Sequence, residues 1–299
     1  MAKARAIAGR RKAVNNIRKI TRTMQLIATA RYQQSLGRAV GARPYTDKIT
    51  ELVQQVSQAG GTIEHALLKK NDSADREAMF LITSNRGLCG GYNASLIRSA
   101  MALHRSVESR SRQCDLFVVG KKGVNYFKFM RRPLKQSYPQ LKDAPAFAAV
   151  APIGDSFMAA YAAGEYAAIH VVYMKYITAA RQTPETIQLL PISAEAVSAG
   201  GSSAERAGGG GSRTVQYDFS PVPAELLGEL LPLTVKVRLF QCFCDAAVSE
   251  NVGRMVAMKS ATDAAGDMSK SLSQQYNRAR QSQITMELLD IMGGVEALK

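Results

Sequence analysis

Apolar residues near the start of the chain recur every three or four positions. They lie at Ala13, Ile17, Ile20, Met24 and Ile27, and further on at Ile49, Leu52 and Val56. This spacing places one narrow apolar stripe on a long α-helix, and residues 2–59 contain a single proline, Pro44. At about 1.5 Å per residue such a helix extends over roughly 85 Å, more than one small core can cover.

The same period returns near the end of the chain. From about Pro221 onward the apolar stripe comprises Met258, Ala261, Ala265, Met268, Leu272, Tyr276 and Ala279. Pro232 predicts a kink or a restart of this helix, because proline lacks the backbone N–H and crowds the preceding turn. Two long helices with one thin stripe each can bury those stripes against one another. We therefore expect an antiparallel coiled coil of the two terminal helices.

The middle of the chain has short apolar runs instead. They are "AMFLITS", "CDLFVVG", "YAAIHVVYMKYI" and "TIQLLPIS", and helical segments follow the first two. Strands that alternate with helices predict a mainly parallel sheet covered on both faces. The expected fold is thus α+β, with a central Rossmann-like α/β domain at 60–220 between helices at 1–59 and 221–299. The segment 199–213, rich in Gly and Ser, is expected to be a flexible surface loop.

Candidate chemistry is sparse. The stretch "SNRGLCGGYN" at 84–93 lies between a strand and a helix, where backbone N–H groups can hold a phosphate. It lacks the Lys-Ser/Thr of a P-loop and the G-x-G-x-x-G spacing. We interpret it as a tight turn that uses Gly87, Gly90 and Gly91 for backbone freedom. The four Cys and three His are scattered, so the sequence predicts reduced thiols, no metal, no cofactor and no catalytic residues.

Positive charge is concentrated at the start. The formal net charge is +15, and residues 1–50 hold twelve Lys or Arg against one acid, whereas residues 222–299 hold eight against nine. The last-helix carboxylates Asp245, Glu250, Asp263 and Asp267 have the spacing of solvated faces. Neighbouring like charges on one helix repel by a few tenths of a kcal/mol per pair, which weakens the interpretation as a merely solvated face. An acidic partner would remove that repulsion.

Two other interpretations of the basic helix are a mitochondrial presequence and a nucleic-acid-binding protein. The apolar stripe continues past residue 50, which argues against a presequence. A basic coiled-coil nucleic-acid-binding protein remains the alternative function, although a zipper within the same helix and interleaved base-stacking aromatics are missing. An acidic protein surface therefore suits this helix best.

Three stretches resemble the gamma subunit of F-type ATP synthases. They are "ARAIAGRRKAVNNIRKITRTMQLIATARYQQS" with "ARPY" at 42–45, the central "TSNRGLCGGYN", and "SENVGRMVAMKSATDAAGDM" followed by "YNRARQSQITMELLDIMGG". The resemblance covers nearly the whole chain, and its last motif is highly specific. It implies a non-catalytic rotor shaft, present in one copy, whose terminal helices turn inside a ring of alpha and beta subunits. The α/β domain would contact the epsilon subunit and the membrane ring of c subunits, so that proton-driven rotation is coupled to ATP synthesis, or to hydrolysis in reverse.

The resemblance also implies contact residues by position. Arg280, Gln281 and Thr285 match residues that make polar contacts with a loop of the beta subunit. Met24 and its basic neighbours match the segment that faces the acidic hinge region of beta. The apolar tip from Ile284 through Leu298, which includes Leu288 and Ile291, matches the end that turns in an apolar collar.

The sequence predicts a peripheral association with a membrane. No stretch approaches the eighteen or so uninterrupted apolar residues that cross a bilayer, and the start lacks the apolar core of a secretory signal. No transit peptide is evident. With the resemblance, this leads us to expect a location on the cytoplasmic face of a bacterial plasma (inner) membrane.

Overall fold

The computed structural model describes residues 2–59, 65–139, 141, 143–192 and 223–297. These residues form two compact units, which we call the terminal unit (residues 1–30 with 253–299) and the central unit (residues 31–252). The predicted loop at 199–213 lies outside the described residues. Because the division into units falls within the long helices, it does not coincide with the predicted domain boundaries, which remain predictions.

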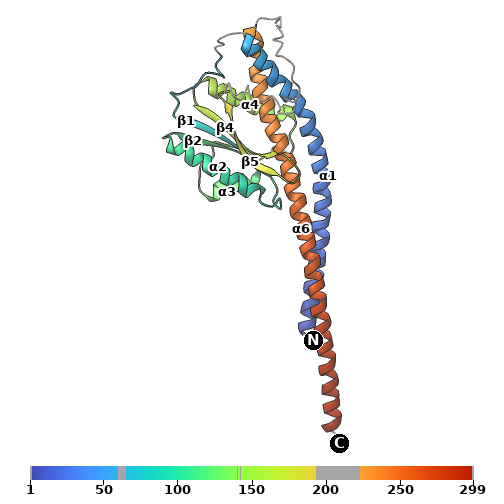
Figure 1. The fold of residues 1–299 in the computed structure, drawn as a ribbon. Coiled ribbons are helices and arrows are strands. Elements are labelled where there is room, and N and C mark those ends of the chain that lie inside the picture. The colour runs from blue at the N-terminus through green and yellow to red at the C-terminus, as the bar shows by residue number, and fades with distance from the viewer. Residues whose placement is uncertain (1, 60–64, 140, 142, 193–222, 298–299) are drawn as a thin grey trace, which may run out of the picture. The chain divides into compact units, whose positions relative to one another are not determined.

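Both predicted terminal helices are present. Helix α1 spans Ala2–Ala59 and helix α6 spans Pro223–Ala297 (Figure 1). Each contains one proline, Pro44 in α1 and Pro232 in α6. The predicted restart at Pro232 is wrong, because α6 is continuous there: proline removes one backbone hydrogen bond, and Leu231 and Val235, one on each side of it, pack in the central core and hold the helix.

The central unit contains a five-stranded sheet in the order β3-β2-β1-β4-β5. Its strands are β1 (Arg76–Ile82), β2 (Gln113–Val119), β3 (Gln136–Tyr138), β4 (Ala168–Tyr176) and β5 (Gln182–Leu190). Strands β1 to β4 are parallel and β5 runs antiparallel to β4. This confirms the mainly parallel sheet. Strand β3 was not predicted, because three residues are too few to show an alternating pattern.

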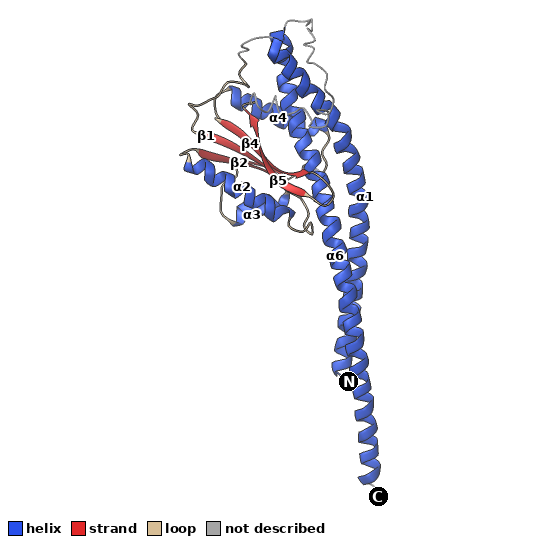
Figure 2. Cartoon of the chain, in the orientation of Figure 1, coloured by secondary structure: helices blue, strands red, loops and turns tan. Residues whose placement is uncertain are grey.

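Helices cover both faces of the sheet (Figure 2). Helices α2 (Tyr92–Ser109) and α3 (Lys121–Phe129) pack on one face, and α4 (Phe147–Ala162) with the start of α6 packs on the other. Alternate β1 residues supply the two cores, Phe80 to one and Met79 and Leu81 to the other, as the two-residue period of a strand requires. The Phe80 ring meets the rings of Phe157 and Phe243 edge to face, which ties α4 and α6 to the sheet.

One carboxylate is fully buried at the start of β1. Glu77 has no exposed surface, and its oxygens lie 3.2 Å from Arg110 Nη2, 3.0 Å from Arg112 Nη1 and 3.1 Å from His170 Nε2. Burial lowers the pKa of His170 below its ordinary value, and the nearby Glu77 carboxylate opposes that shift. The two guanidinium groups therefore supply the positive charge that a buried carboxylate needs.

Candidate functional site

The two long helices run antiparallel within the terminal unit. Ser269 Oγ donates to Asn15 Oδ1 at 2.7 Å, and Thr262 Oγ1 donates to Thr21 Oγ1 at 2.8 Å. The guanidinium of Arg11 lies 5.1 Å above the ring centre of Tyr276. As the residue number rises along α1 it falls along α6, which confirms the predicted antiparallel helix pair. We call the facing residues of this unit the interhelical seam.

The apolar stripe predicted for α1 does not form this seam. Ile17, Ile20 and Ile27 are 52%, 59% and 50% exposed, whereas Thr21 and Ala28 are buried. Val14, Thr21 and Ala28 are seven residues apart, which is the repeat of a coiled coil. The isoleucines lie on a neighbouring stripe. Small seam residues allow the two helix backbones to approach closely, and the larger isoleucines are left on the outer surface.

The stripe predicted for α6 is correct in part. Met258 and Ala265 are buried, as predicted, but Met268 is 57% exposed and the neighbouring Ser269 occupies the seam. The reason is again geometric, since a coiled coil selects positions by their place in the seven-residue repeat and not by hydrophobicity alone. Further along α1, in the central unit, Ile49 and Val53 enter the core while Leu52 stays exposed.

The basic helix has no carboxylate partners in the part of the terminal unit that the structure describes. No ion pair is formed by its described cations, which are Arg5, Arg10, Arg11, Lys12, Arg18, Lys19 and Arg22. An ion pair in this unit joins Lys270 to Asp267, both on α6. Met24 is half-buried on the same helix. The outer surface of α1 thus combines unpaired positive charge with exposed isoleucines.

The last turns of α6 are exposed on all sides. Every side chain from Ile284 through Gly294 is exposed, and Figure 1 shows α6 continuing past the N-terminus of α1. We call residues 284–294 the free end of α6. Ile284, Leu288 and Ile291, which the resemblance assigns to the shaft tip, lie in it. One turn earlier Arg280 and Gln281 are exposed, and the Thr285 hydroxyl donates to the Gln281 carbonyl at 3.0 Å.

Groups in and next to the glycine turn at 84–91 accept hydrogen bonds from the start of α3. Three N–H groups at the start of α3 already have acceptors: Lys121 N–H bonds Asn85 Oδ1 (3.3 Å), Lys122 N–H bonds the Ser84 carbonyl (3.1 Å) and Gly123 N–H bonds Thr83 Oγ1 (3.0 Å). The start of α3 is therefore built as a closed turn.

Only one of the three glycines in this turn needs its conformational freedom. Gly90 has φ of 60°, whereas Gly91 has φ of −79°. The second left-handed position is taken by Leu88, with φ of 63°, although leucine pays a steric cost there. The prediction that Gly87, Gly90 and Gly91 all serve backbone freedom is thus correct for Gly90 alone, because the chain reverses at Leu88 and Gly90.

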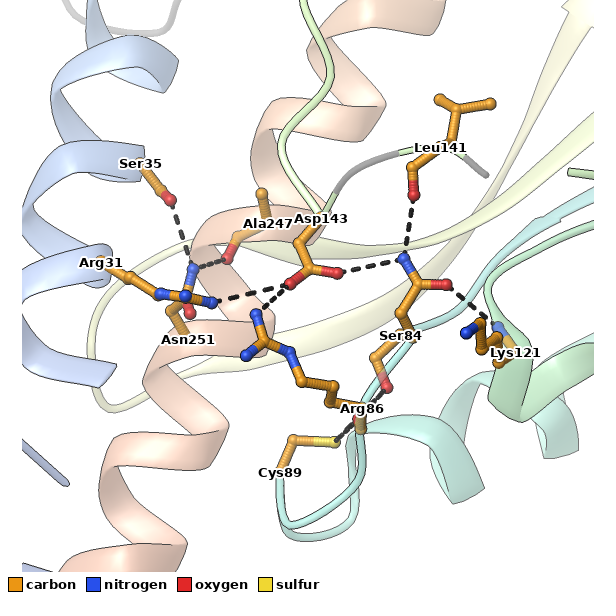
Figure 3. A network of polar contacts seen from close by, with 11 residues as sticks. Arg31, Ser35, Ser84, Arg86, Cys89, Lys121, Leu141, Asp143, Ala247 and Asn251 are labelled. Atoms are coloured by element: carbon orange, nitrogen blue, oxygen red, sulfur yellow. Dashed lines mark hydrogen bonds and ion pairs between the residues drawn. The ribbon is translucent and has the colours of Figure 1, made fainter. Parts of the chain in front are cut away.

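The same turn is joined to α1 through an aspartate that the sequence did not single out. Within the central unit, Asp143 lies 2.7 Å from Arg86 Nη2 and 3.8 Å from Arg31 Nη1, and Asn85 Nδ2 donates to it at 3.1 Å (Figure 3). Asn85 Nδ2 also donates to the Leu141 carbonyl at 2.9 Å. Asp143 therefore connects the glycine turn with helix α1. It lies in an irregular segment without periodicity, so no sequence pattern could have identified it.

Two α6 carboxylates are buried, which corrects their predicted place on a solvated face. Asp245 and Glu250 are buried in the central unit, whereas Asp263 and Asp267 are exposed as predicted. Asp245 lies 3.6 Å from Arg43 Nη2 of α1. Burial raises the pKa of Asp245 to about 6, and Arg43 opposes the shift. The first part of α6 faces the sheet as well as α1, so it has no wide solvated face.

The cysteines are packing residues. All four are free thiols; Cys89 and Cys242 are buried, and Cys242 and Cys244, two residues apart on α6, join different cores. Burial raises the pKa of the Cys244 thiol to about 11 and that of Cys114 to about 12, which disfavours the reactive thiolate. In the described part of the chain, no three His, Cys, Asp or Glu side chains are grouped to hold a metal ion.

None of the described helices is both long enough and apolar enough to cross a membrane.

The chain matches the ATP synthase family model over residues 3–298. It is 44% identical over 299 residues to the ATP synthase gamma chain of Rhodopirellula baltica and 35% identical over 298 residues to that of Leptospira biflexa, and each match covers all of both chains. Its fold is similar to a chain in the Euglena gracilis mitochondrial ATP synthase (OSCP/F1/c-ring), with a TM-score of 0.68 at 17% identity, covering 99% of this chain and 95% of that one. The chain belongs to the ATP synthase gamma chain family.

Proposed function

We propose that this chain is the shaft that couples proton-driven rotation of a membrane c ring to ATP synthesis, or to hydrolysis in reverse, at alpha and beta catalytic sites. As a gamma chain it is a non-catalytic subunit, the central stalk of an F-type ATP synthase. Its partner subunits and the coupling of rotation to catalysis are what we infer in addition. A shaft does no chemistry itself: it presents a different surface to each catalytic site as it turns.

The observation that carries the proposal is the free end of α6. Six large apolar side chains are exposed there on one helix: Ile284, Met286, Leu288, Leu289, Ile291 and Met292. An exposed apolar surface of this extent marks an interaction site on a soluble unit. These apolar side chains cover most of the circumference of the helix end, and the acids Glu287 and Asp290 take the remaining side, which suits a largely apolar collar in which the end can turn.

Two further features support contact with beta subunits. The unpaired cations of α1 suit an acidic surface, to which Met24 and its basic neighbours would turn. Arg280 and Gln281, one turn before the free end, and Thr285 within it present polar groups that a beta-subunit loop would contact. We assign the epsilon subunit and the c ring to the central unit, with one gamma chain per complex.

The proposed location follows from these partners. A shaft that contacts a membrane ring of c subunits is peripheral to that membrane, and gamma chains of bacteria are the chain's relatives. We therefore place it on the cytoplasmic face of a bacterial plasma (inner) membrane. Fractionation tests this: the chain should leave washed membranes together with the alpha and beta subunits, and separate release would contradict it.

Reconstitution tests the function. Mixing this chain with separated alpha and beta subunits should restore ATP hydrolysis, whereas the chain alone should hydrolyse none. Failure to restore hydrolysis would count against the shaft. The nucleic-acid alternative predicts instead a duplex DNA affinity that falls steeply as salt rises, because binding there would release counterions.

A further inference from the structure

A second concentration of positive charge lies in the central unit, on helices α2 and α3. Residues 92–135 contain ten Lys or Arg against two acids, Glu108 and Asp115, a net +8 within a chain of +15. Both acids are already engaged, Glu108 with Arg132 and Asp115 with Arg76. The contacts proposed for α1 and for the free end of α6 leave this charge without a role.

Six of these ten cations form no ion pair with another described residue, whereas the other four pair with Glu77, Glu108 or Asp115. Four of the six lie in α3 or in the turn directly after it, and like charges so close together repel one another. An anionic partner would remove that repulsion. All six side chains are exposed, and they are Arg98, Arg105, Lys121, Lys122, Lys128 and Arg131.

The two lysines at the start of α3 oppose the helix dipole. Helix α3 begins with Lys121 and Lys122, and its first turn contains no acid. Because the N-terminus of a helix carries a partial positive charge, cations there destabilise the helix. Residues that work against local stability, with no compensating acid in the same turn, are expected where a surface has a function.

Phe129 adds an apolar anchor to this charge. At the last position of α3 it is 84% exposed, more than any other large apolar side chain in the described part of the chain, and the adjoining Met130 is 45% exposed. Val124 and Phe127 of the same helix are buried against the sheet. An exposed aromatic ring among cations has the composition of a protein-binding hot spot, in which aromatic residues and Arg are enriched.

Two other anionic partners fit α3 less well. A helix that lies on a membrane surface needs an apolar face along its length, whereas the apolar face of α3 is already buried through Val124 and Phe127. A single-stranded nucleic acid needs several rings on which its bases can stack. Helix α3 offers one, Phe129, because the Tyr126 ring packs edge to face on Phe127. An acidic protein segment needs only the cations and one anchor.

We propose that α3 docks an acidic segment of another protein, whose carboxylates contact Lys121, Lys122 and Lys128 and whose apolar side chain covers Phe129. Lys121 and Lys128 are seven residues apart, as are Lys122 and Phe129, so all four lie on one side of α3. That side belongs to the sheet face opposite α4 and α6 (Figure 2). The surface is distinct from those assigned to the beta subunit on α1 and at the end of α6. The proposal goes beyond the proposed function and rests on it only in taking the partner to be a member of the assembled complex.

Photo-crosslinking in the assembled complex identifies the occupant. The chain carries p-benzoylphenylalanine in place of Phe129, and the purified, membrane-bound complex is irradiated. We expect a protein crosslink that mass spectrometry locates in a segment with more Asp and Glu than Lys and Arg. A crosslink to lipid, to nucleic acid or to a segment without this excess of acids would overturn the proposal, and so would the absence of a crosslink. The same group in place of Phe147, on α4 at the other sheet face, should not give this product, and an identical product there would also overturn it.

Charge reversal tests the role of the lysines. In the same background, Lys121→Glu with Lys128→Glu should lower the crosslink yield about fivefold or more, because each reversal replaces an attraction by a repulsion. The melting temperature should change little, since the glutamate at 121 suits the helix dipole and the one at 128 opposes it. The matched control, Lys69→Glu with Lys70→Glu, changes the net charge equally at exposed lysines outside α3 and should keep the yield. An equal yield in both variants would overturn the proposal.

Binding by the isolated full chain separates this proposal from the proposed function. The probe is a fluorescent helical peptide with glutamates on one side and leucines on the other. Phe129→Ser should weaken its binding about fivefold or more, because the anchor is lost, whereas Ile177→Ser, at an exposed residue after β4, should not. Equal affinities of these two variants would overturn the docking surface. Failure of the natural chain to assemble with alpha and beta subunits would refute the proposed function and leave the peptide result intact.

Discussion

Asp245 of helix α6 is buried and faces Arg43 of helix α1 at 3.6 Å. The pairing joins the two long helices within the central unit, and Arg43 also donates to the Tyr176 carbonyl of β4 at 3.3 Å. One arginine thus connects both terminal segments of the chain with the sheet. The pKa of Asp245 nevertheless rises to about 6, because the loss of hydration outweighs the attraction of a half-exposed arginine.

This shift predicts a pH-dependent stability. The native state keeps a proton on Asp245 that the unfolded chain releases near pH 3.8, so the free energy of unfolding should fall by about 3 kcal/mol as pH rises from 4 to above 6. Asp245→Asn has no such penalty. Its melting temperature should exceed that of the natural chain by several degrees at pH 8, and the gain should shrink towards pH 4. A constant difference across this range would contradict the prediction; Asp263→Asn, exposed on the same helix, is the control.

Glu77 should be the most sensitive carboxylate of the sheet. Glu77→Gln removes a fully buried charge that compensates Arg110 and Arg112, and we expect the free energy of unfolding to fall by about 3 kcal/mol. Glu108→Gln, at a half-exposed carboxylate, should cost less than about 1 kcal/mol. Urea unfolding of both variants measures the difference, and equal effects would show that the buried cluster does not stabilise the sheet.

Asp143 should anchor the glycine turn to helix α1. Asp143→Ala removes its contacts with Arg86, Arg31 and Asn85, and should cost about 1 to 2 kcal/mol because the carboxylate is only partly exposed. Hydrogen exchange at residues 84–91 should quicken. The control is Asp155→Ala, which removes a single ion pair with Lys236 at an exposed carboxylate. If exchange in the turn stays unchanged, Asp143 does not hold it.

The exposed isoleucines of α1, Ile17 and Ile20, should contribute to assembly with other subunits and not to the stability of the isolated chain. Ile17→Ser with Ile20→Ser changes exposed side chains, so the unfolding free energy of the isolated chain should stay within about 0.5 kcal/mol. Assembly with alpha and beta subunits, followed by gel filtration, should weaken. Ala28→Leu is the opposite case: it overfills a buried seam position and should destabilise the isolated chain. If the isoleucine variant lost stability, Ile17 and Ile20 would have to pack in the seam, which would contradict the prediction.

Removal of the free end should separate folding from coupling. A chain that ends after Gln283 lacks only side chains that make no buried contact among the described residues, so its melting temperature should change little. Assembly or ATP-driven proton pumping should weaken, because the apolar end no longer fills its collar. Unchanged pumping would refute the role given to this end.

The long helices and four of the strands could be predicted from patterns along the chain. Long stretches with almost no proline and a period of three to four predicted α1 and α6, and the short apolar runs "AMFLITS", "CDLFVVG", "YAAIHVVYMKYI" and "TIQLLPIS" predicted strands β1, β2, β4 and β5. Helix α4 was not predicted, although "FAAVAPIGDSFMAAYA" is rich in good helix formers, because its apolar residues surround the helix and show no single stripe. The basic character of the first helix could also be predicted from the sequence, because residues 1–50 contain twelve Lys or Arg.

Which face of each helix is buried depends on packing between segments that lie far apart in the sequence. Ile17 and Ile20 are more hydrophobic than Thr21, yet Thr21 is buried, because Thr262 on the partner helix satisfies its hydroxyl and close approach of the backbones favours a small side chain. Periodicity along one helix cannot reveal this, as it depends on a residue 241 positions away. The same holds for Asp143 and Arg31, whose contact is made by folding and has no pattern along the chain.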